Sequence, residues 1–126
     1  MKAYSDKHLL KLWRQAVLKN NKGQCFLCGN MNIDELECHH IVKRRHKILR
    51  YEVWNGIPVC RYTCHNQIDS LKGRRELRDA FPERFDMLEK YENMTLKEYL
   101  FKNELTENEF LVIRSNELKE IIKGDV

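Results

Sequence analysis

Cysteine and histidine residues are concentrated in one stretch in the first half of this chain. The stretch contains two cysteine pairs, two adjacent histidines and a third histidine: Cys25 and Cys28, Cys60 and Cys64, His39 and His40, and His65. Thiolate and imidazole are side chains that bind zinc and other transition metals. Because there are too many of these residues here to be filling a core, we expect the chemistry of the protein to lie in this stretch.

The two cysteine pairs are spaced to hold one metal ion together. Cys25 and Cys28 precede Gly29, as in a zinc knuckle, where glycine allows the tight backbone that turns both sulfurs toward one ion. Cys60 and Cys64 have three intervening residues where two are more usual, so we expect their sulfurs at a turn that enters a helix. The four thiolates predict one tetrahedral structural zinc site. The alternatives are free buried thiols or a redox pair.

The histidines offer the groups that hydrolysis of a phosphodiester needs. Such an enzyme deprotonates water, stabilises extra negative charge on phosphorus and assists the departing oxygen. One histidine of the pair His39-His40, together with His65, can hold a divalent cation, and the other can be the general base. Asn55 or a backbone carbonyl can fix the tautomer of that base. The alternative is that the histidines are structural and that Asn55-Gly56 is an ordinary turn.

Basic residues accompany these candidate ligands. Residues 1–75 carry 15 Lys and Arg against 6 Asp and Glu, whereas residues 76–126 carry 8 against 13. A basic surface attracts polyanions through phosphate contacts, so nucleic acid is the expected partner, although basic residues also solvate many surfaces. The expected DNA contacts lie in the basic connection 42–54, at Lys43, Arg44, Arg45 and Arg50.

Length and composition set further bounds. A chain of 126 residues with a 42% hydrophobic fraction is one domain's worth with a modest core, which favours a structural metal. The N-terminus leads into a charged amphipathic stretch, and no apolar run approaches the roughly 20 residues of a membrane span. We therefore expect a cytoplasmic protein with no membrane partner. Five cysteines without an export signal fit thiolate ligands plus one spare thiol better than a disulfide framework.

The elements that must position these residues are helices and two strands. Residues 5–20 have helical apolar spacing, with Ser5 or Asp6 available as the N-cap. Residues 34–41 predict a strand that places Cys38 and His40 on one face and His39 on the other. Cys38 is expected to be a buried strand thiol, or a ligand if the Cys64 spacing is unsuitable. After the Asn55-Gly56 turn signal, a short strand over residues 57–59 and a helix over residues 65–72, ended by Gly73, complete this part.

The remaining chain is acidic and helical. Helical segments are expected over residues 76–81, 82–91, 95–104 and 106–123. Thr95 and Thr106 each begin a sequence that fits a capping box. No catalytic set is recognisable in these segments, so packing or partner binding is the expected role.

Four segments, taken in order, resemble the HNH endonuclease family, particularly its small phage-type members: Cys25-Phe26-Leu27-Cys28, Glu37-Cys38-His39-His40-Ile41-Val42, Trp54-Asn55-Gly56-Ile57-Pro58-Val59-Cys60 and Cys64-His65. The resemblance covers residues 24–73. It implies a ββα-metal fold, in which a hairpin and a helix clasp one divalent ion, often with a separate four-cysteine zinc site. It also implies cleavage that leaves 5′-phosphate and 3′-hydroxyl ends.

The resemblance also implies roles for individual residues. His39 and His65 resemble the ligands of the catalytic divalent ion, which is Mg²⁺, Mn²⁺, Ni²⁺ or Zn²⁺. His40 resembles the general base, and Asn55 resembles the residue that fixes the loop and helps orient that base. The structural zinc ligands are implied to be Cys25, Cys28, Cys60 and Cys64, and the three-residue gap in the second cysteine pair departs from the family pattern.

We therefore expect an α+β protein with a ββα-metal core and zinc knuckles, flanked by an N-terminal helix and C-terminal helices. Residues 1–75 form the expected nuclease core, and residues 76–126 form an acidic extension packed on or beside it. The expected function is a metal-dependent DNA endonuclease or nicking enzyme, in the bacterial host cell if phage-encoded. One ion and one base cut one strand, so a double-strand break needs a dimer or two events.

Two other functions stay open. A non-catalytic zinc-ribbon DNA-binding module would use the histidines structurally, and a thiol–disulfide protein would use Cys25 and Cys28. The acidic extension could mask the site, form a homodimer or dock onto a larger phage protein complex.

Overall fold

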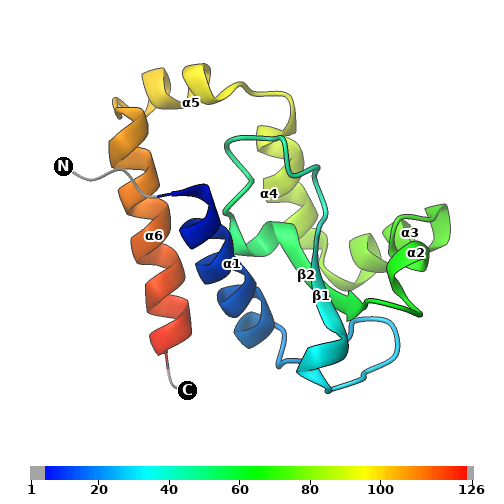
Figure 1. The fold of residues 1–126 in the computed structure, drawn as a ribbon. Helices are drawn as coiled ribbons and strands as arrows, with labels where there is room; N and C mark the ends of the chain where they lie inside the picture. The colour runs from blue at the N-terminus through cyan, green and yellow to red at the C-terminus, as the bar shows by residue number, and fades with distance from the viewer. Residues whose placement is uncertain (1–4, 125–126) are drawn as a thin grey trace.

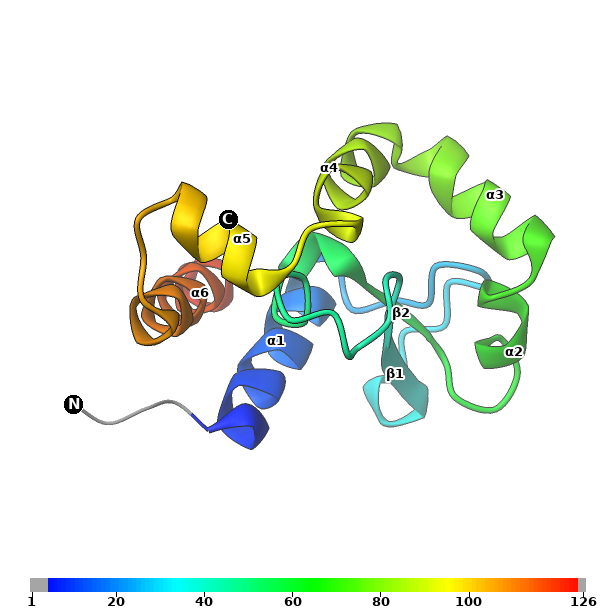
Figure 2. The same cartoon turned by 90° about the horizontal axis from the view of Figure 1, so that it is seen from above.

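A two-stranded antiparallel sheet lies at the centre of an α+β fold in the computed structural model, which describes residues 5–124 (Figure 1). The described elements are, in order, α1 (Asp6–Asn20), η1 (Ile33–Glu35), β1 (Leu36–His40), η2 (Val53–Asn55), β2 (Gly56–Cys60), α2 (His65–Ile68), α3 (Leu71–Ala80), α4 (Pro82–Glu92), α5 (Leu96–Lys102) and α6 (Glu107–Lys123). Figures 1 and 2 show α1 and α6 on one side of the sheet and α2 and α3 on the other.

The predicted first strand is present but shorter than expected. Residues 33–35 form a 3₁₀ turn instead, because the Asn32 side chain accepts a hydrogen bond from the Asp34 amide at 3.2 Å. β1 then pairs with β2 from Leu36 opposite Cys60 to His40 opposite Gly56. The predicted strand over residues 57–59 is confirmed and extends by one residue at each end.

The predicted N-terminal helix is confirmed as α1, with Ser5 rather than Asp6 as its N-cap: the Ser5 side chain accepts from the His8 amide at 3.1 Å. Its buried face packs against β2 and η2. A Cβ on Gly56 would lie 2.4 Å from a Val17 methyl carbon and 2.6 Å from the Trp13 ring. Glycine at this position therefore allows α1 to approach the start of β2 closely.

The prediction of one helix over residues 65–72, ended by Gly73, is wrong. α2 ends at Ile68, and α3 begins at Leu71 after Ser70, whose side chain accepts from the Gly73 amide at 3.0 Å. Gly73 lies inside the first turn of α3, where a Cβ would stand 2.1 Å from the Gln67 carbonyl oxygen. Gly73 is thus required for the close junction of two helices and not for a stop.

The C-terminal helices follow the predicted boundaries closely. Residues 76–80 of the predicted segment 76–81 belong to the longer α3, and Thr106 forms the predicted capping box with Glu109. α6 packs along α1, and its buried Arg114 donates to the Ile48 carbonyl at 2.9 Å and to the Glu52 carboxylate at 3.0 Å (Figure 1). These contacts mean that α6 helps to hold the connection between the two strands.

None of the helices in the described part of the chain combines the length and apolar character needed to cross a membrane.

Candidate functional site

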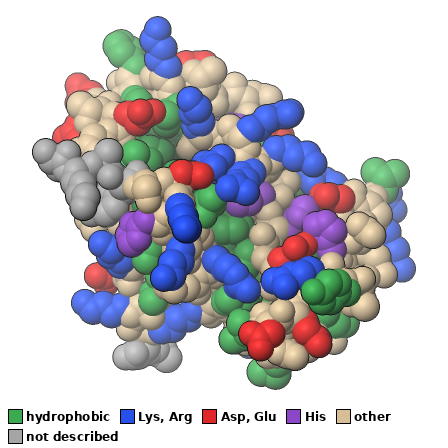
Figure 3. Space-filling model, viewed as in Figure 1, with side chains coloured by type: hydrophobic (Ala, Val, Ile, Leu, Met, Phe, Trp, Pro, Cys, Tyr) green, Lys and Arg blue, Asp and Glu red, His purple; other side chains and the backbone are tan. Residues whose placement is uncertain are grey.

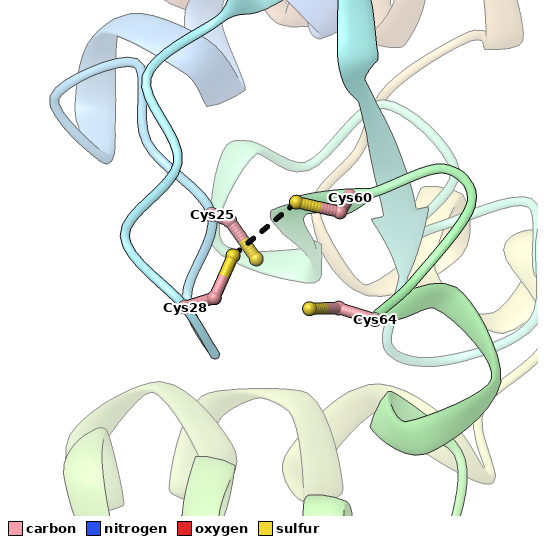
Figure 4. A group of neighbouring side chains, drawn as sticks. All are labelled: Cys25, Cys28, Cys60 and Cys64. Atoms are coloured by element: carbon pink, nitrogen blue, oxygen red, sulfur yellow. Dashed lines mark hydrogen bonds between the residues drawn. The ribbon is translucent and has the colours of Figure 1, made fainter.

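The four predicted zinc-ligand cysteines meet at one point. Their sulfur atoms all lie within 4.8 Å of one another, and Figure 4 shows the four side chains directed toward a common centre. Cys25 and Cys28 come from the loop after α1, Cys60 ends β2, and Cys64 directly precedes α2. This group could hold a metal ion, and four thiolates are typical ligands of structural zinc. The three-residue gap in the second cysteine pair is compatible with this convergence.

Local backbone structure explains how the first cysteine pair converges. Gly29 has a φ of +77°, a conformation that side chains disfavour, and its amide donates to the Cys25 carbonyl at 2.9 Å. The Cys25 amide in turn donates to the Asn30 carbonyl at 2.9 Å. The Phe26 amide donates to the Pro58 carbonyl at 2.9 Å, which ties this loop to β2. The predicted role of Gly29 in a tight turn is confirmed.

The two predicted ligand histidines, His39 on β1 and His65 at the start of α2, lie together. The ring centroids of His39 and His65 are 6.3 Å apart, and each ring is paired with a carboxylate. His39 Nε2 lies 3.0 Å from Asp69 Oδ1, and His65 Nδ1 contacts Glu37 Oε1. We call His39, His65, Glu37 and Asp69 the histidine–carboxylate cluster. Imidazole and carboxylate together suit a divalent cation of intermediate hardness.

The histidine–carboxylate cluster is organised as two imidazole–carboxylate pairs. Among residues 5–124, the four cysteines are the one group of three or more Cys, His, Asp and Glu side chains placed closely enough to hold a metal ion, and the histidine–carboxylate cluster does not form such a group in this arrangement. A cation in the cluster would therefore replace imidazole–carboxylate contacts with metal bonds. Burial lowers the pKa of His39, against the opposing effect of Asp69, so its ring favours the neutral form that binds metals.

His40 occupies a different environment from His39, as the predicted alternation along the strand requires. Its ring stacks on Trp13 of α1 with centroids 3.9 Å apart and planes 7° apart. Its Nε2 lies 2.9 Å from the Arg50 carbonyl oxygen and so carries the proton of the neutral ring. Burial lowers the pKa of His40 to about 4, so the ring is neutral at pH 7 and its other nitrogen can accept a proton.

Asn55 is completely buried and holds the strand connection from inside. Its side-chain oxygen accepts from the Val42 amide at 2.6 Å, and its nitrogen donates to the carbonyls of Val42 and Leu49, both at 3.0 Å. The Asn55 side chain thus fixes both ends of the connection. The group that accepts a hydrogen bond from His40 is the Arg50 carbonyl oxygen, not Asn55. Asn55 acts on His40 through that connection, and Asn55-Gly56 also closes the turn that the sequence indicated, because Asn55 ends η2 and the Gly56 amide donates to the Val53 carbonyl.

The predicted DNA-contact residues divide into two groups. Lys43, Arg44 and Arg45 are exposed, and Figure 3 shows Lys and Arg side chains on the same face as histidine side chains. Arg50 instead pairs with Asp6, through Nε to Oδ1 at 2.7 Å and Nη2 to Oδ2 at 2.6 Å. These hydrogen bonds from Arg50 lower the pKa of Asp6 to about 2. The charge of Arg50 is therefore already balanced within the protein.

Three residues of this region were not singled out from the sequence. Asp69 follows His65 by four positions, the spacing that places residues on one helical face, and Glu37 precedes His39 by two on one face of a strand. These spacings could have identified both carboxylates. Trp13 has no such signal, because it reaches His40 through the packing of α1 on the sheet.

The fifth cysteine lies outside both groups. The Cys38 sulfur lies 3.7 Å from the Arg14 carbonyl oxygen on α1, and burial raises the pKa of its thiol to about 11. Cys38 was predicted to be a buried strand thiol; it lies in β1 and packs against α1, but it is half-buried.

Comparison with known proteins finds no matching family model, no matching curated protein and no matching solved structure.

Proposed function

We propose that this protein is a metal-dependent DNA endonuclease or nicking enzyme of the HNH type. The observation that carries the proposal is the pairing of His39 and His65, far apart in sequence, with their rings 6.3 Å apart and a carboxylate on each. The cluster gathers two imidazoles and two carboxylates, and the exposed Lys43, Arg44 and Arg45 follow β1 along the chain. This combination favours binding of a cation beside a phosphate.

The chain supplies a base and the groups that orient it. His40 accepts a proton from the attacking water at the ring nitrogen that does not face the Arg50 carbonyl. Trp13 sets the plane of the ring, and Asn55 holds the connection that carries the accepting carbonyl. His39 and His65, with Asp69 or Glu37, would hold the divalent ion. When bound, that ion would stabilise negative charge on the phosphate and on the departing oxygen.

The cysteine group has a separate task in this proposal. A zinc ion with Zn–S bonds of about 2.3 Å fits four sulfurs at tetrahedral separations within the observed 4.8 Å limit. Three of the four cysteines pack in the core that contains Leu36, Val59 and Ile68. We therefore assign the zinc to the fold, where it joins the loop after α1 to the junction between β2 and α2.

Removing a carboxylate of the histidine–carboxylate cluster tests whether the cluster binds a cation. Asp69→Asn is expected to weaken Mn²⁺ binding by about 10- to 100-fold, because the amide loses the charge next to His39. Titration calorimetry of the zinc-loaded protein measures this without DNA. Asn66→Ala, at an exposed position of the same helix, is the matched control and should bind Mn²⁺ as wild type does. Equal affinity in Asp69→Asn would place the cation elsewhere.

The exposed cations of the strand connection are expected to contact DNA phosphates. Lys43→Gln and Arg45→Gln should each reduce the slope of log affinity against log salt by about 0.9, because one fewer counterion is released. Arg50→Gln should leave the slope nearly unchanged, because Asp6 already neutralises Arg50. Fluorescence anisotropy with a labelled duplex over a range of salt concentrations measures the slopes. If all three variants keep the wild-type slope, DNA does not contact this connection.

The second candidate is a non-catalytic zinc-ribbon DNA-binding module. The direct pairing of each cluster histidine with a carboxylate favours it, because such pairs also occur as structural hydrogen bonds. The two candidates differ in one result: the module binds a duplex without cutting it when a divalent ion is added. A thiol–disulfide function is distinguished by dithiol reductase activity, which a zinc-bound Cys25 and Cys28 would lack.

A further inference from the structure

Arg84, near the start of α4, is a buried arginine with no carboxylate of residues 5–124 in direct contact, and Glu52 is the acidic group that acts on it from a longer distance. Its relative exposure is 8%, and no carboxylate in the described part of the chain lies within 4.0 Å of its guanidinium. Its one hydrogen bond to protein is from Nη1 to the Gly56 carbonyl, long at 3.4 Å, and its Cζ lies 4.0 Å from the centre of the Phe81 ring. A buried charge paired this poorly is costly unless another group satisfies it.

Arg114, the second buried arginine among the described residues, has the partners expected of an arginine with a structural role. Arg114 has an exposure of 7% and also lies over an aromatic ring, that of Phe110. It donates to Glu52 and Glu117, each at 3.0 Å, and to the Ile48 carbonyl at 2.9 Å. Arg84 and Arg114 are almost equally buried, and each lies over an aromatic ring. Arg114 has carboxylates within hydrogen-bond distance and Arg84 has none in residues 5–124, so burial alone does not explain the difference.

The guanidinium of Arg84 borders open space. Two cavities, of about 250 Å³ and about 390 Å³, share Arg84, Phe81 and Asn20 in their walls. Lys22 lines the smaller cavity, and Trp54, which is 37% exposed, lines the larger one. The nitrogen atoms of Arg84 that Gly56 does not engage can therefore be reached by a ligand.

The surrounding groups favour a negatively charged ligand. The first turn of α4 lines the larger cavity, and its N-cap residue, Phe81, has no side-chain oxygen to accept from the free amides. These amides and the helix dipole attract an anion. The exposed Glu83 is the carboxylate in this wall and opposes an anion, whereas Lys22 favours one. An exposed indole beside such a site can stack on a base.

We propose that Arg84 and the N-terminus of α4 bind the phosphate group of a nucleotide, and that Trp54 stacks on its base. The recess shares no wall residue with the histidine–carboxylate cluster, although Cys25 of the cysteine group lies in the wall of the smaller cavity. The proposal therefore goes beyond the cutting reaction and does not depend on it. The nucleotide is either free or part of a single strand, and both present the same phosphate and base.

Calorimetry on the full-length, zinc-loaded protein tests this site with three probes: inorganic phosphate, deoxyadenosine monophosphate and a short oligothymidine. Arg84→Met keeps an unbranched apolar side chain and removes the guanidinium that lies over Phe81, so it is expected to weaken nucleotide binding at least about 10-fold. Lys97→Met removes the same charge at an exposed position of α5 and is the matched control. Trp54→Ala should weaken binding of the nucleotide and leave that of inorganic phosphate unchanged.

Thermal unfolding separates this role from a structural one. Arg84→Met should keep or raise the melting temperature, because a buried charge with no carboxylate in contact is removed, whereas Arg114→Met should lower it by removing the direct hydrogen bond to Glu52. Tighter binding of the oligothymidine than of the mononucleotide would identify a strand as the ligand, and the reverse would identify a free nucleotide. Wild-type affinity for all three probes in Arg84→Met, or no binding by wild type, would overturn the proposal.

Discussion

Replacing His40 by alanine is expected to reduce DNA cutting by about 10²- to 10⁴-fold while DNA affinity stays unchanged, because a general base contributes a factor of this size. His40 is neutral at pH 7, since burial lowers its pKa to about 4, and its Nε2 is held by the Arg50 carbonyl. The ring is thus oriented and unprotonated at neutral pH, and its low pKa makes it a weaker base than a free imidazole. Cutting rates and duplex affinity are measured side by side on the same preparations.

The His40 result needs a variant that keeps the local packing, because the ring stacks on Trp13. His40→Gln can still donate to the Arg50 carbonyl but cannot act as a base near neutral pH, and it should lose as much activity as His40→Ala. His8→Ala, at an exposed position of α1, is the matched control and should cut at the wild-type rate. Activity near wild type in both His40 variants would mean that another group is the base.

Replacing Cys28 by serine is expected to remove the structural metal and to unfold the region around it. Cys28 is exposed, so the substitution leaves no hole in the core, and its effect reports the lost thiolate. A structural zinc contributes about 10–16 kcal/mol in zinc-finger peptides, whereas a typical domain is stable by about 5–15 kcal/mol. We therefore expect a large fall in melting temperature together with a loss of zinc by elemental analysis.

Cys38→Ser is the matched control for the metal site. It makes the same chemical change in the same chain, but Cys38 lies against α1 and outside the cysteine group. This variant should retain about one zinc per chain and most of its stability. A Cys28→Ser protein with the wild-type zinc content and melting temperature would show that the four cysteines do not hold a structural metal together.

The sequence was most informative where function depends on neighbours along the chain. The turn at Gly29, the Ser5 and Thr106 caps and the alternation of His39 and His40 are local properties, set by backbone conformation and by the period of a strand or helix. The convergence of the four cysteines was also predictable, because two cysteine pairs with this spacing can bind one zinc ion only if all four sulfurs come together.

Contacts between distant segments could not be obtained in this way. The stacking of Trp13 on His40 depends on how closely α1 approaches Gly56, and the pairing of Arg50 with Asp6 depends on where the strand connection folds back. Gly73 was predicted to end a helix because glycine often does so. Glycine is needed here because a Cβ at this position would clash with the Gln67 carbonyl oxygen. Each of these outcomes is set by tertiary packing.

The most direct test of the central proposal is the fate of supercoiled plasmid DNA incubated with zinc-loaded protein, with and without added Mg²⁺, Mn²⁺ or Ni²⁺. The proposal predicts open circles that accumulate only when one of these ions is present, and not with His40→Ala. Plasmid that stays supercoiled with every ion, at protein concentrations where binding to the same DNA is complete, would contradict the endonuclease and leave the non-catalytic DNA-binding module.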